Sequence, residues 1–272
     1  MNEGLPELEL FGSAAQREMM RQGVALRQIT REDPRFSFYG RHVSLTSLCT
    51  NAISLVSSLA QLQGASSCIY VPKQEADNFC LSLNQLGFVT DRFEVWRGGE
   101  TALEASRTII AQRQIPPDLE VLTIGADTPG SVMAALDEVT SSCGVLLPFG
   151  DVMRGIDTQS VCLLAMDGCG KPVASAASVA FNHPESAHGE DAWWGMLATR
   201  EDRRGEGIAI FLGAMAMSLM NKRYGYSSFS TGVRTGNTAS ERLCQYLGLS
   251  AGSYCAVGAL VPDRFKDGRM TR

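Results

Sequence analysis

The stretch RRGEGIA, residues 203–209, constrains the fold more than any other part of the chain, because it joins a predicted strand to a long apolar helix. The strand is expected over 192–199 and the helix over about 206–223. Apolar side chains cover one face of this helix and much of the remaining surface, which is typical of a helix packed against a sheet. Gly205 and Gly207 predict a tight turn directly before the helix. This order of elements predicts an α/β fold.

The rest of the chain alternates short apolar strands with helices. Helices are expected over 43–62, 74–86 and 129–139, and a short element over 149–155. Strands are expected over 68–71, 92–96, 161–166, 173–181 and in EVLTIGA at 120–126, with a turn at 167–170. The segment 98–117 opens on two glycines and closes on two prolines, which predicts a linker with a helical portion. The sequence therefore predicts two domains, residues 1–117 and 118–272.

The turn before the helix also predicts an anion site. The first turn of a helix presents unpaired N–H groups, and glycines allow a ligand to approach the backbone closely. Arg200, Arg203 and Arg204 add local positive charge to a chain whose formal net charge is -5. That net charge argues against a general attraction to nucleic acid or to an anionic membrane. The alternative is a tight strand-to-helix turn with solvated arginines.

Two motifs carry a resemblance to a known family. Residues 197–199 followed by 204–209 resemble the Q/R-x-x-G-x-G/A acyl-CoA motif of the GNAT N-acetyltransferase superfamily. Residues 237–249 are similar to a second motif of this superfamily, N-x-x-A-x-x-L-Y-x-x-x-G-F, and match it at Asn237, Leu243 and Gly248. The two motifs cover about the last 150 residues, so the resemblance implies a mixed α/β (α+β) sheet with the GNAT fold.

The resemblance implies that acyl-CoA, acetyl-CoA in the simplest case, is the cosubstrate. The sheet would be splayed open at the strand that ends at Thr199, and the pantetheine arm would lie in the gap. Asn237 would form a hydrogen bond to this arm. Alternatively, Asn237 is only the residue before a T-x-x-E capping box formed by Thr238 and Glu241. The implied acyl-CoA site comprises Met196, Leu197, Ala198, Thr199, Arg204, Gly205, Glu206, Gly207, Ile208, Ala209, Asn237 and Ser240.

The implied reaction is direct acyl transfer to an amine of a small molecule or peptide. The backbone N–H of Leu197 would donate to the thioester carbonyl, where negative charge grows. Cys244 stands where the family pattern places a tyrosine that protonates the thiolate, and Tyr246 lies two residues away. Glu190 is a candidate base acting through water, although it also fits a solvated hairpin end. Trp193 and Trp194 alternate faces of the strand, so one of them is expected to face the acceptor.

The N-terminal half resembles a second, degenerate copy of the same fold. Leu86-Gly87-Phe88 mirrors Leu247-Gly248-Leu249, and a strand follows each of them. This half has no R-x-x-G-x-G/A motif, and Ala76 stands at the position that the same offset aligns with Asn237. We therefore expect a tandem arrangement in which only the C-terminal half binds CoA.

The remaining expectations concern surroundings and partners. The eight scattered cysteines form no C-x-x-C pair, which predicts reduced thiols and a cytoplasmic protein without a metal site. The acidic N-terminus and the absence of a long apolar run predict neither a signal peptide nor a membrane span. A monomer or homodimer is expected, with no nucleic-acid or membrane partner. A non-catalytic acyl-CoA or ligand-binding module, longer acyl chains and a hydroxyl acceptor remain alternatives.

Overall fold

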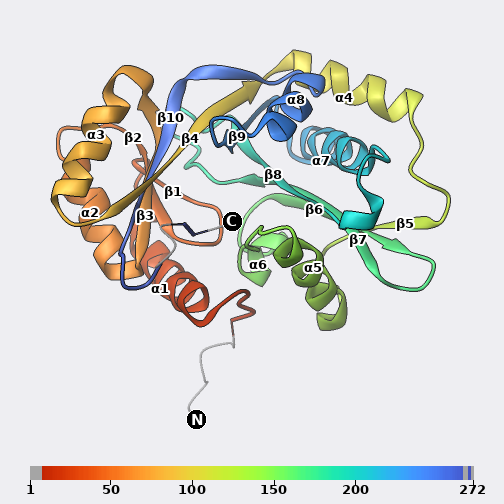
Figure 1. Cartoon of the computed structure of the whole chain (residues 1–272), viewed down its shortest axis with the longest axis horizontal. Coiled ribbons are helices and arrows are strands. Elements are labelled where there is room, and N and C mark those ends of the chain that lie inside the picture. Colours follow the sequence, from red (N-terminus) through yellow and green to blue (C-terminus); the bar gives the residue numbers. More distant parts are fainter. Residues whose placement is uncertain (1–7, 266–268, 271–272) are drawn as a thin grey trace, which may run out of the picture.

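The strands form one continuous sheet in a computed structural model that describes residues 8–265 and 269–270 (Figure 1). Within these residues the sheet has ten strands in the order β1-β2-β3-β10-β4-β9-β8-β7-β6-β5. The strands are β1 (Phe36–Phe38), β2 (Val43–Ser47), β3 (Ala65–Pro72), β4 (Val89–Gly98), β5 (Leu119–Thr123), β6 (Ser160–Asp167), β7 (Pro172–Ala180), β8 (Asp191–Thr199), β9 (Ser228–Val233) and β10 (Ser250–Leu260). The helices are α1 (Ala14–Thr30), α2 (Ala52–Gln63), α3 (Lys73–Gln85), α4 (Glu100–Gln112), α5 (Gly130–Ser142), α6 (Gly150–Met153), α7 (Ile208–Tyr224) and α8 (Thr238–Tyr246), with a 3-10 turn, η1 (Glu201–Arg203).

Helices cover both faces of the C-terminal part of the sheet. Along β6, Cys162 and Leu164 pack into the core that includes α1, α5 and α6, whereas Leu163 and Ala165 pack into the core under α4 and α7. This alternation follows from the two-residue period of a strand. In Figure 1, α4, α7 and α8 accordingly lie on one side of the sheet, and α1, α5 and α6 on the other.

A βαβαβ unit occurs twice. The first runs through β2, α2, β3, α3 and β4, and the second through β8, α7, β9, α8 and β10. Gly64 and Gly225 end the first helices of the two units, and Gly87 and Gly248 follow the second helices, all with positive φ. Both pairs of glycines show the offset that relates Leu86-Gly87-Phe88 to Leu247-Gly248-Leu249. In each unit the first two strands pair in parallel. The structure thus confirms the internal offset and the tandem organisation.

The two units exchange their last strands. β10 pairs antiparallel with both β3 and β4, and β4 also pairs with β9. The last strand of each unit is therefore hydrogen-bonded to the second strand of the other unit. Strands from both sides of residue 117, where the sequence suggested a domain boundary, belong to one continuous sheet.

The helix expected over 43–62 is wrong in its first part. Residues 43–47 form β2, and α2 begins only at Ala52. Four of the five residues of β2 are buried because the strand is covered on both faces. A short buried strand does not alternate polar and apolar residues, so periodicity alone does not separate it from the start of a helix.

Three further elements escaped the sequence analysis: α1, β1 and β9. A signal for α1 was present, because Ser13 and Gln16 form a reciprocal capping box at its start. The expected strands at 68–71, 92–96, 161–166, 173–181 and 192–199 are confirmed, as are the helices at 74–86, 129–139 and 206–223 to within a few residues at each end.

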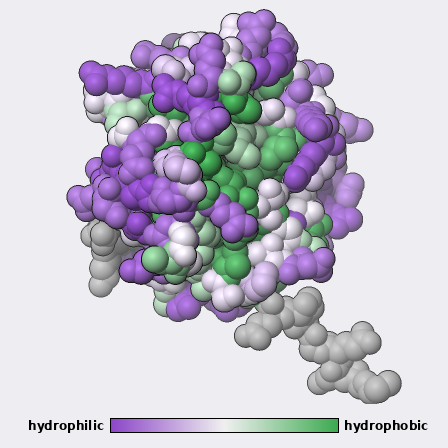
Figure 2. Space-filling model, turned by 90° about the vertical axis from the view of Figure 1, so that its right-hand side faces the viewer, coloured by the Kyte–Doolittle hydropathy of each residue, from purple (hydrophilic) through white to green (hydrophobic). Residues whose placement is uncertain are grey.

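Seen from the side that carries β5 and the β6–β7 hairpin, apolar residues gather in a central hollow surrounded by hydrophilic residues (Figure 2).

None of the helices in the described part of the chain combines the length and apolar character that a membrane crossing requires.

Candidate functional site

The site begins where β8 and β9 part. These parallel strands pair only from Asp191 to Trp193 on β8 and from Ser228 to Ser230 on β9. Further along β8, the pairing with β7 shifts register around Gly195–Ala198, which marks a β-bulge. Met196 has a φ of 57° in this bulge, a conformation that is costly for a residue with a Cβ. The hydroxyl of Ser175 donates to the Met196 carbonyl oxygen at 2.7 Å and helps to hold it.

The turn after β8 presents backbone N–H groups. Gly205 and Gly207 have φ values of 85° and 78°, which only glycine adopts readily, and α7 starts at the next residue, Ile208. A Cβ added to Gly205 would meet no atom within 4 Å, so the backbone is approachable there. The 17-residue α7 directs its N-terminus, with its partial positive charge, at this turn.

Acidic neighbours neutralise two of the three arginines that the sequence placed at the turn. Arg200 pairs with Asp167 and Asp202, and Arg203 pairs with Asp118 and Glu206. The expectation that all three supply free positive charge is therefore wrong. Arg204 is exposed and makes no ion pair with any described residue; its Nε donates to the Thr199 carbonyl oxygen at 3.2 Å.

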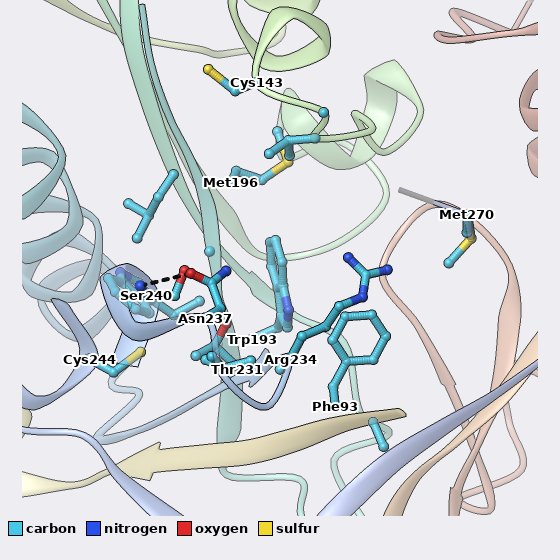
Figure 3. A pocket seen from close by; sticks show the side chains of 18 of the residues that line it. Phe93, Cys143, Trp193, Met196, Thr231, Arg234, Asn237, Ser240, Cys244 and Met270 are labelled. Carbon is cyan, nitrogen blue, oxygen red and sulfur yellow. Dashed lines mark hydrogen bonds between the residues drawn. The ribbon is translucent and has the colours of Figure 1, made fainter. Parts of the chain in front are cut away.

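A cavity of about 800 Å³ extends from this turn, through the gap between β8 and β9, to the N-terminal half (Figure 3). The cavity brings together ten of the residues predicted from the sequence: Met196, Leu197, Thr199, Arg204, Gly205, Ile208, Ala209, Asn237, Ser240 and Cys244. Ala198 instead packs into the core, and Glu206 and Gly207 line a smaller neighbouring pocket. The carboxylate of Glu206 is engaged by Arg203, which leaves only its backbone for a ligand.

Asn237 caps α8. Its Oδ1 accepts the backbone N–H of Ser240 at 3.2 Å (Figure 3), and Glu241 accepts the N–H of Gly236 at 3.2 Å. The cap is therefore Asn237 itself, and the alternative that placed it before a Thr238 cap is wrong. The side-chain nitrogen Nδ2 takes no part in the cap and is a donor at the cavity wall.

The three side chains proposed for proton transfer lie in different environments. Cys244 is 2% exposed and lines the cavity, and burial, helped by the nearby charge of Glu241, raises the pKa of its thiol to about 12. Tyr246 is half exposed and points elsewhere, since its hydroxyl accepts from Arg113 at 2.8 Å. Glu190 is exposed and does not line the cavity.

The two tryptophans of β8 face opposite sides, as expected. Trp193 lines the cavity, where its ring lies over Gly195 and stacks on Tyr39 with centroids 5.5 Å apart. Trp194 is buried on the other face, and its indole N–H donates to the Gly213 carbonyl oxygen at 3.0 Å. An alanine at Gly195 would collide with the Trp193 ring, so this glycine permits the orientation of the indole.

The N-terminal half supplies a wall of the cavity, as expected for a degenerate copy that covers the sheet, but the sequence did not single out the residues that form it. Tyr39, Arg41 and His42, from the β1–β2 connection, line the cavity opposite β8. Burial lowers the pKa of His42 to about 3, so the imidazole is neutral. On β9's side, Arg234 pairs with Asp91 at 2.6 Å and lies over the Phe93 ring (Figure 3). No local motif marks Arg41 or His42, because only tertiary contacts between the two halves of the chain bring them to the cavity.

A buried polar network closes the paired end of β8. Asp191, which is 1% exposed, accepts from Arg97 at 2.7 Å and from the Tyr70 hydroxyl at 3.1 Å. Burial raises the pKa of Tyr70, which keeps its hydroxyl a donor. This network ties the first paired residue of β8 to β3 and β4. Among the described residues, no group of three or more His, Cys, Asp or Glu side chains is arranged to hold a metal ion.

Comparison with solved structures identifies the fold. No family model and no curated protein sequence matches the chain. A GCN5-related N-acetyltransferase from Kribbella flavida matches with a TM-score of 0.56 and 13% identity, over 93% of this chain and 98% of that one. A GCN5-related N-acetyltransferase-like protein from Streptococcus suis matches with a TM-score of 0.53 and 16% identity, over 90% of this chain and 99% of that one. The chain therefore has the fold of the GCN5-related N-acetyltransferases.

Proposed function

We propose that this protein transfers an acyl group from acyl-CoA, acetyl-CoA in the simplest case, to an amine of a small molecule or peptide. The observation that carries the proposal is the gap between β8 and β9, which leads from a cavity to the glycine turn at the start of α7. A pyrophosphate needs unpaired N–H groups and a nearby cation, and a pantetheine arm needs a strand edge for its amides. Both requirements are met along one continuous cavity.

In this proposal the backbone N–H groups of residues 205–209 and the guanidinium of Arg204 bind the pyrophosphate. Arg204 suits this task because no described carboxylate competes for it. The pantetheine amides pair with the edge of β8 beyond Trp193, and Nδ2 of Asn237 donates to the arm. Ser240 and Ala209 line the same part of the cavity.

The chemical step joins the acceptor nitrogen to the thioester carbonyl carbon. The amine attacks in its neutral form, the C–N bond forms, the C–S bond breaks, and the CoA thiolate takes up a proton. The backbone N–H of Leu197 donates to the carbonyl oxygen, where negative charge develops. The nitrogen loses its surplus proton after the C–N bond has formed, and this proton reaches the thiolate through water. Cys244 holds its own proton tightly and is not needed as the donor.

One observation favours a non-catalytic binding module as the second candidate. The carboxylate of Asp91 lines the cavity but is committed to Arg234, and Glu190 lies outside. The described cavity therefore offers no unpaired carboxylate as a general base. Transfer then depends on an amine that reaches the site already deprotonated, or on loss of its proton to water.

Calorimetry with CoA tests the binding half of the proposal. We expect Arg204→Glu to weaken CoA binding at least about tenfold, because a phosphate partner is replaced by a like charge. Arg35→Glu, at an exposed arginine remote from the cavity, serves as the control. An unchanged affinity in a folded Arg204→Glu variant would move the pyrophosphate away from this turn.

A CoA-release assay tests the transfer half. Acetyl-CoA and longer acyl donors are offered with amines, amino acids and peptides, and release of free thiol is followed. Turnover with any acceptor supports transfer. CoA binding without turnover across the panel would favour the binding module.

A further inference from the structure

Arg41 carries a buried charge that the described protein does not balance. Its side chain lines the cavity and the residue is only 6% exposed. Other largely buried arginines have carboxylate partners: Arg154 pairs with Glu9, and Arg234 with Asp91. No ion pair joins Arg41 to any carboxylate among the described residues. An isolated charge in such a position is costly unless a counter-charge arrives.

The contacts of Arg41 leave part of the guanidinium unused. Nη2 donates to the Leu146 carbonyl oxygen and lies 3.7 Å from the Met196 sulfur. The guanidinium carbon lies 5.2 Å from the centre of the Tyr39 ring, whose electrons stabilise a cation without neutralising it. Nε is buried without a hydrogen-bond partner. Burial lowers the pKa of Arg41, although an arginine remains protonated at neutral pH.

Arg41 lies near the part of β8 at which the acyl group is proposed to bind. The Met196 side chain that it touches belongs to the bulge of β8, and the next residue is Leu197. The guanidinium therefore lies beside the bulge whose next residue carries the proposed oxyanion donor. Tyr39 and Trp193, stacked on each other, wall the space beside it. The amino group and the carboxylate of an amino acid share one carbon atom, so the two groups would occupy neighbouring positions in this space.

The other charged groups of the cavity do not suit a polycation. Asp91 is neutralised by Arg234, and His42 is neutral. Among the residues that the structure describes, Arg41 thus gives the acceptor end of the cavity a net positive charge, and an amine without an acidic group would enter against it.

We propose that Arg41 binds the carboxylate of the acyl acceptor, and that the acceptor is an amino acid or another amine with a carboxylate close to the reacting nitrogen. This inference rests on the proposed function and names its substrate class. Arg41 forms a charge-assisted contact with the carboxylate, and the amine of the same molecule faces Leu197. Peptides acetylated on an internal lysine and polyamines are thereby disfavoured.

The first experiment compares each amino acid with its amide or its decarboxylated amine, using acetyl-CoA and the wild-type protein. Glycine is tested against glycinamide, phenylalanine against phenylalaninamide and tyrosine against tyramine, with rates corrected for the fraction of neutral amine. For the best substrate we expect kcat/KM to be at least about tenfold higher for the acid. Amides or simple amines that react as well as the acids would overturn the proposal.

The second experiment changes Arg41. Arg41→Gln is expected to raise KM for the amino acid at least about tenfold while the CoA affinity stays within twofold, and Arg41→Lys should recover part of the loss. Arg35→Gln, at an exposed arginine outside the cavity, is the matched control. An unchanged KM in a folded Arg41→Gln variant would refute the role of Arg41. If neither Arg41 variant folds, the comparison of acids with amides and amines in the first experiment decides whether the acceptor carries a carboxylate.

A binding measurement separates this inference from the proposed function. N-acetylglycine and N-acetylphenylalanine, which resemble products, are titrated into the wild-type and Arg41→Gln proteins in the presence of CoA. Binding that is lost with Arg41 supports an anion site even if no acceptor is turned over, in which case only the transfer proposal fails. If no N-acetyl amino acid and no amino acid binds the wild-type protein that binds CoA, the carboxylate site is refuted.

Discussion

Burial decides what Cys244 and His42 can do at the level of single residues. Both line the same cavity, and both are almost completely buried. Burial disfavours the charged form of each group, so the thiol stays protonated and the imidazole stays neutral near pH 7. Neither is therefore suited to accept or donate a proton easily, although their residue types suggest acid–base chemistry.

Replacing Cys244 should cost little activity. With a pKa of about 12, the thiol is neither a ready nucleophile nor a good proton donor. We expect Cys244→Ala to retain turnover within about threefold, and Cys244→Tyr, which introduces the tyrosine of the resembled motif, to raise it. CoA release between pH 6 and 9 is the measurement, and its profile should show no inflection from Cys244. If the alanine variant binds CoA and folds but does not react, the thiol takes part in the chemistry.

His42 should make the fold sensitive to acid. Its pKa is about 3 in the folded protein, against an ordinary value of 6.5, so the unfolded chain binds the proton first. The stabilising contribution is fully present above pH 6.5 and is lost as the pH falls towards 3, by up to about 1.4 kcal/mol per pH unit. Thermal melts at a series of pH values across this range should show that the Tm of the wild type falls steeply as the pH is lowered. The Tm of His42→Gln should fall less steeply. His183→Gln, in the loop before β8, is the control; equal slopes in all three proteins would argue against a buried neutral imidazole.

The connection between the first strand and the first helix differs most between the two βαβαβ units. Four residues, 48–51, join β2 to α2, whereas eight residues, 200–207, join β8 to α7. The helices have 12 and 17 residues, and their C-terminal ends coincide when the two units are aligned at their common offset. The N-terminal unit therefore lacks both the glycine turn and the additional N-terminal helical residues to which we assign the pyrophosphate.

This difference predicts one CoA site per chain. The N-terminal unit has no N–H cradle for a pyrophosphate, and Ala76 is buried in α3 at the offset position of Asn237. Isothermal titration calorimetry of the full chain with CoA should give a stoichiometry of one. Two equivalent sites would mean that the shorter connection also binds CoA.

The exchange of β4 and β10 makes the two halves depend on each other at the scale of the whole molecule. β10 lies between β3 and β4, and its residues Cys255, Val257 and Ala259 pack into the core formed with α2 and α3. A fragment that ends at residue 117 lacks this strand, and a fragment that starts at 118 lacks both of the strand's partners. The cavity wall around Arg41 belongs to the N-terminal half and contacts Met196 of β8, so a fragment that starts at 118 lacks this wall as well.

We therefore expect residues 1–117 and 118–272 not to fold when produced separately. Unpaired strand edges and exposed apolar faces should leave each fragment aggregated or without a cooperative melt by circular dichroism. Co-expression should restore a complex with the thermal transition of the intact chain. A separate 118–272 fragment that melts cooperatively and binds CoA would show that the C-terminal half is independent.

The sequence alone determined the features that arise from local interactions. Gly205, Gly207 and Gly248 adopt the positive φ that glycine allows in turns, and the apolar character of α7 identifies a packed helix. The turn, the helix and the internal repeat were therefore all readable. Helix periodicity and turn chemistry act over a few residues and need no distant partner.

Only the tertiary structure decided the features that depend on residues far apart in the chain. Residues 43–47 become a strand because β1 and β3 pair with them, and Tyr246 turns outward because Arg113 lies over its ring and donates to its hydroxyl. Arg41 meets Met196 across 155 residues of sequence, and the exchange of β4 and β10 brings the two halves together around one cavity. Pairing and burial at such separations depend on which strands become neighbours, and local propensity does not carry that information.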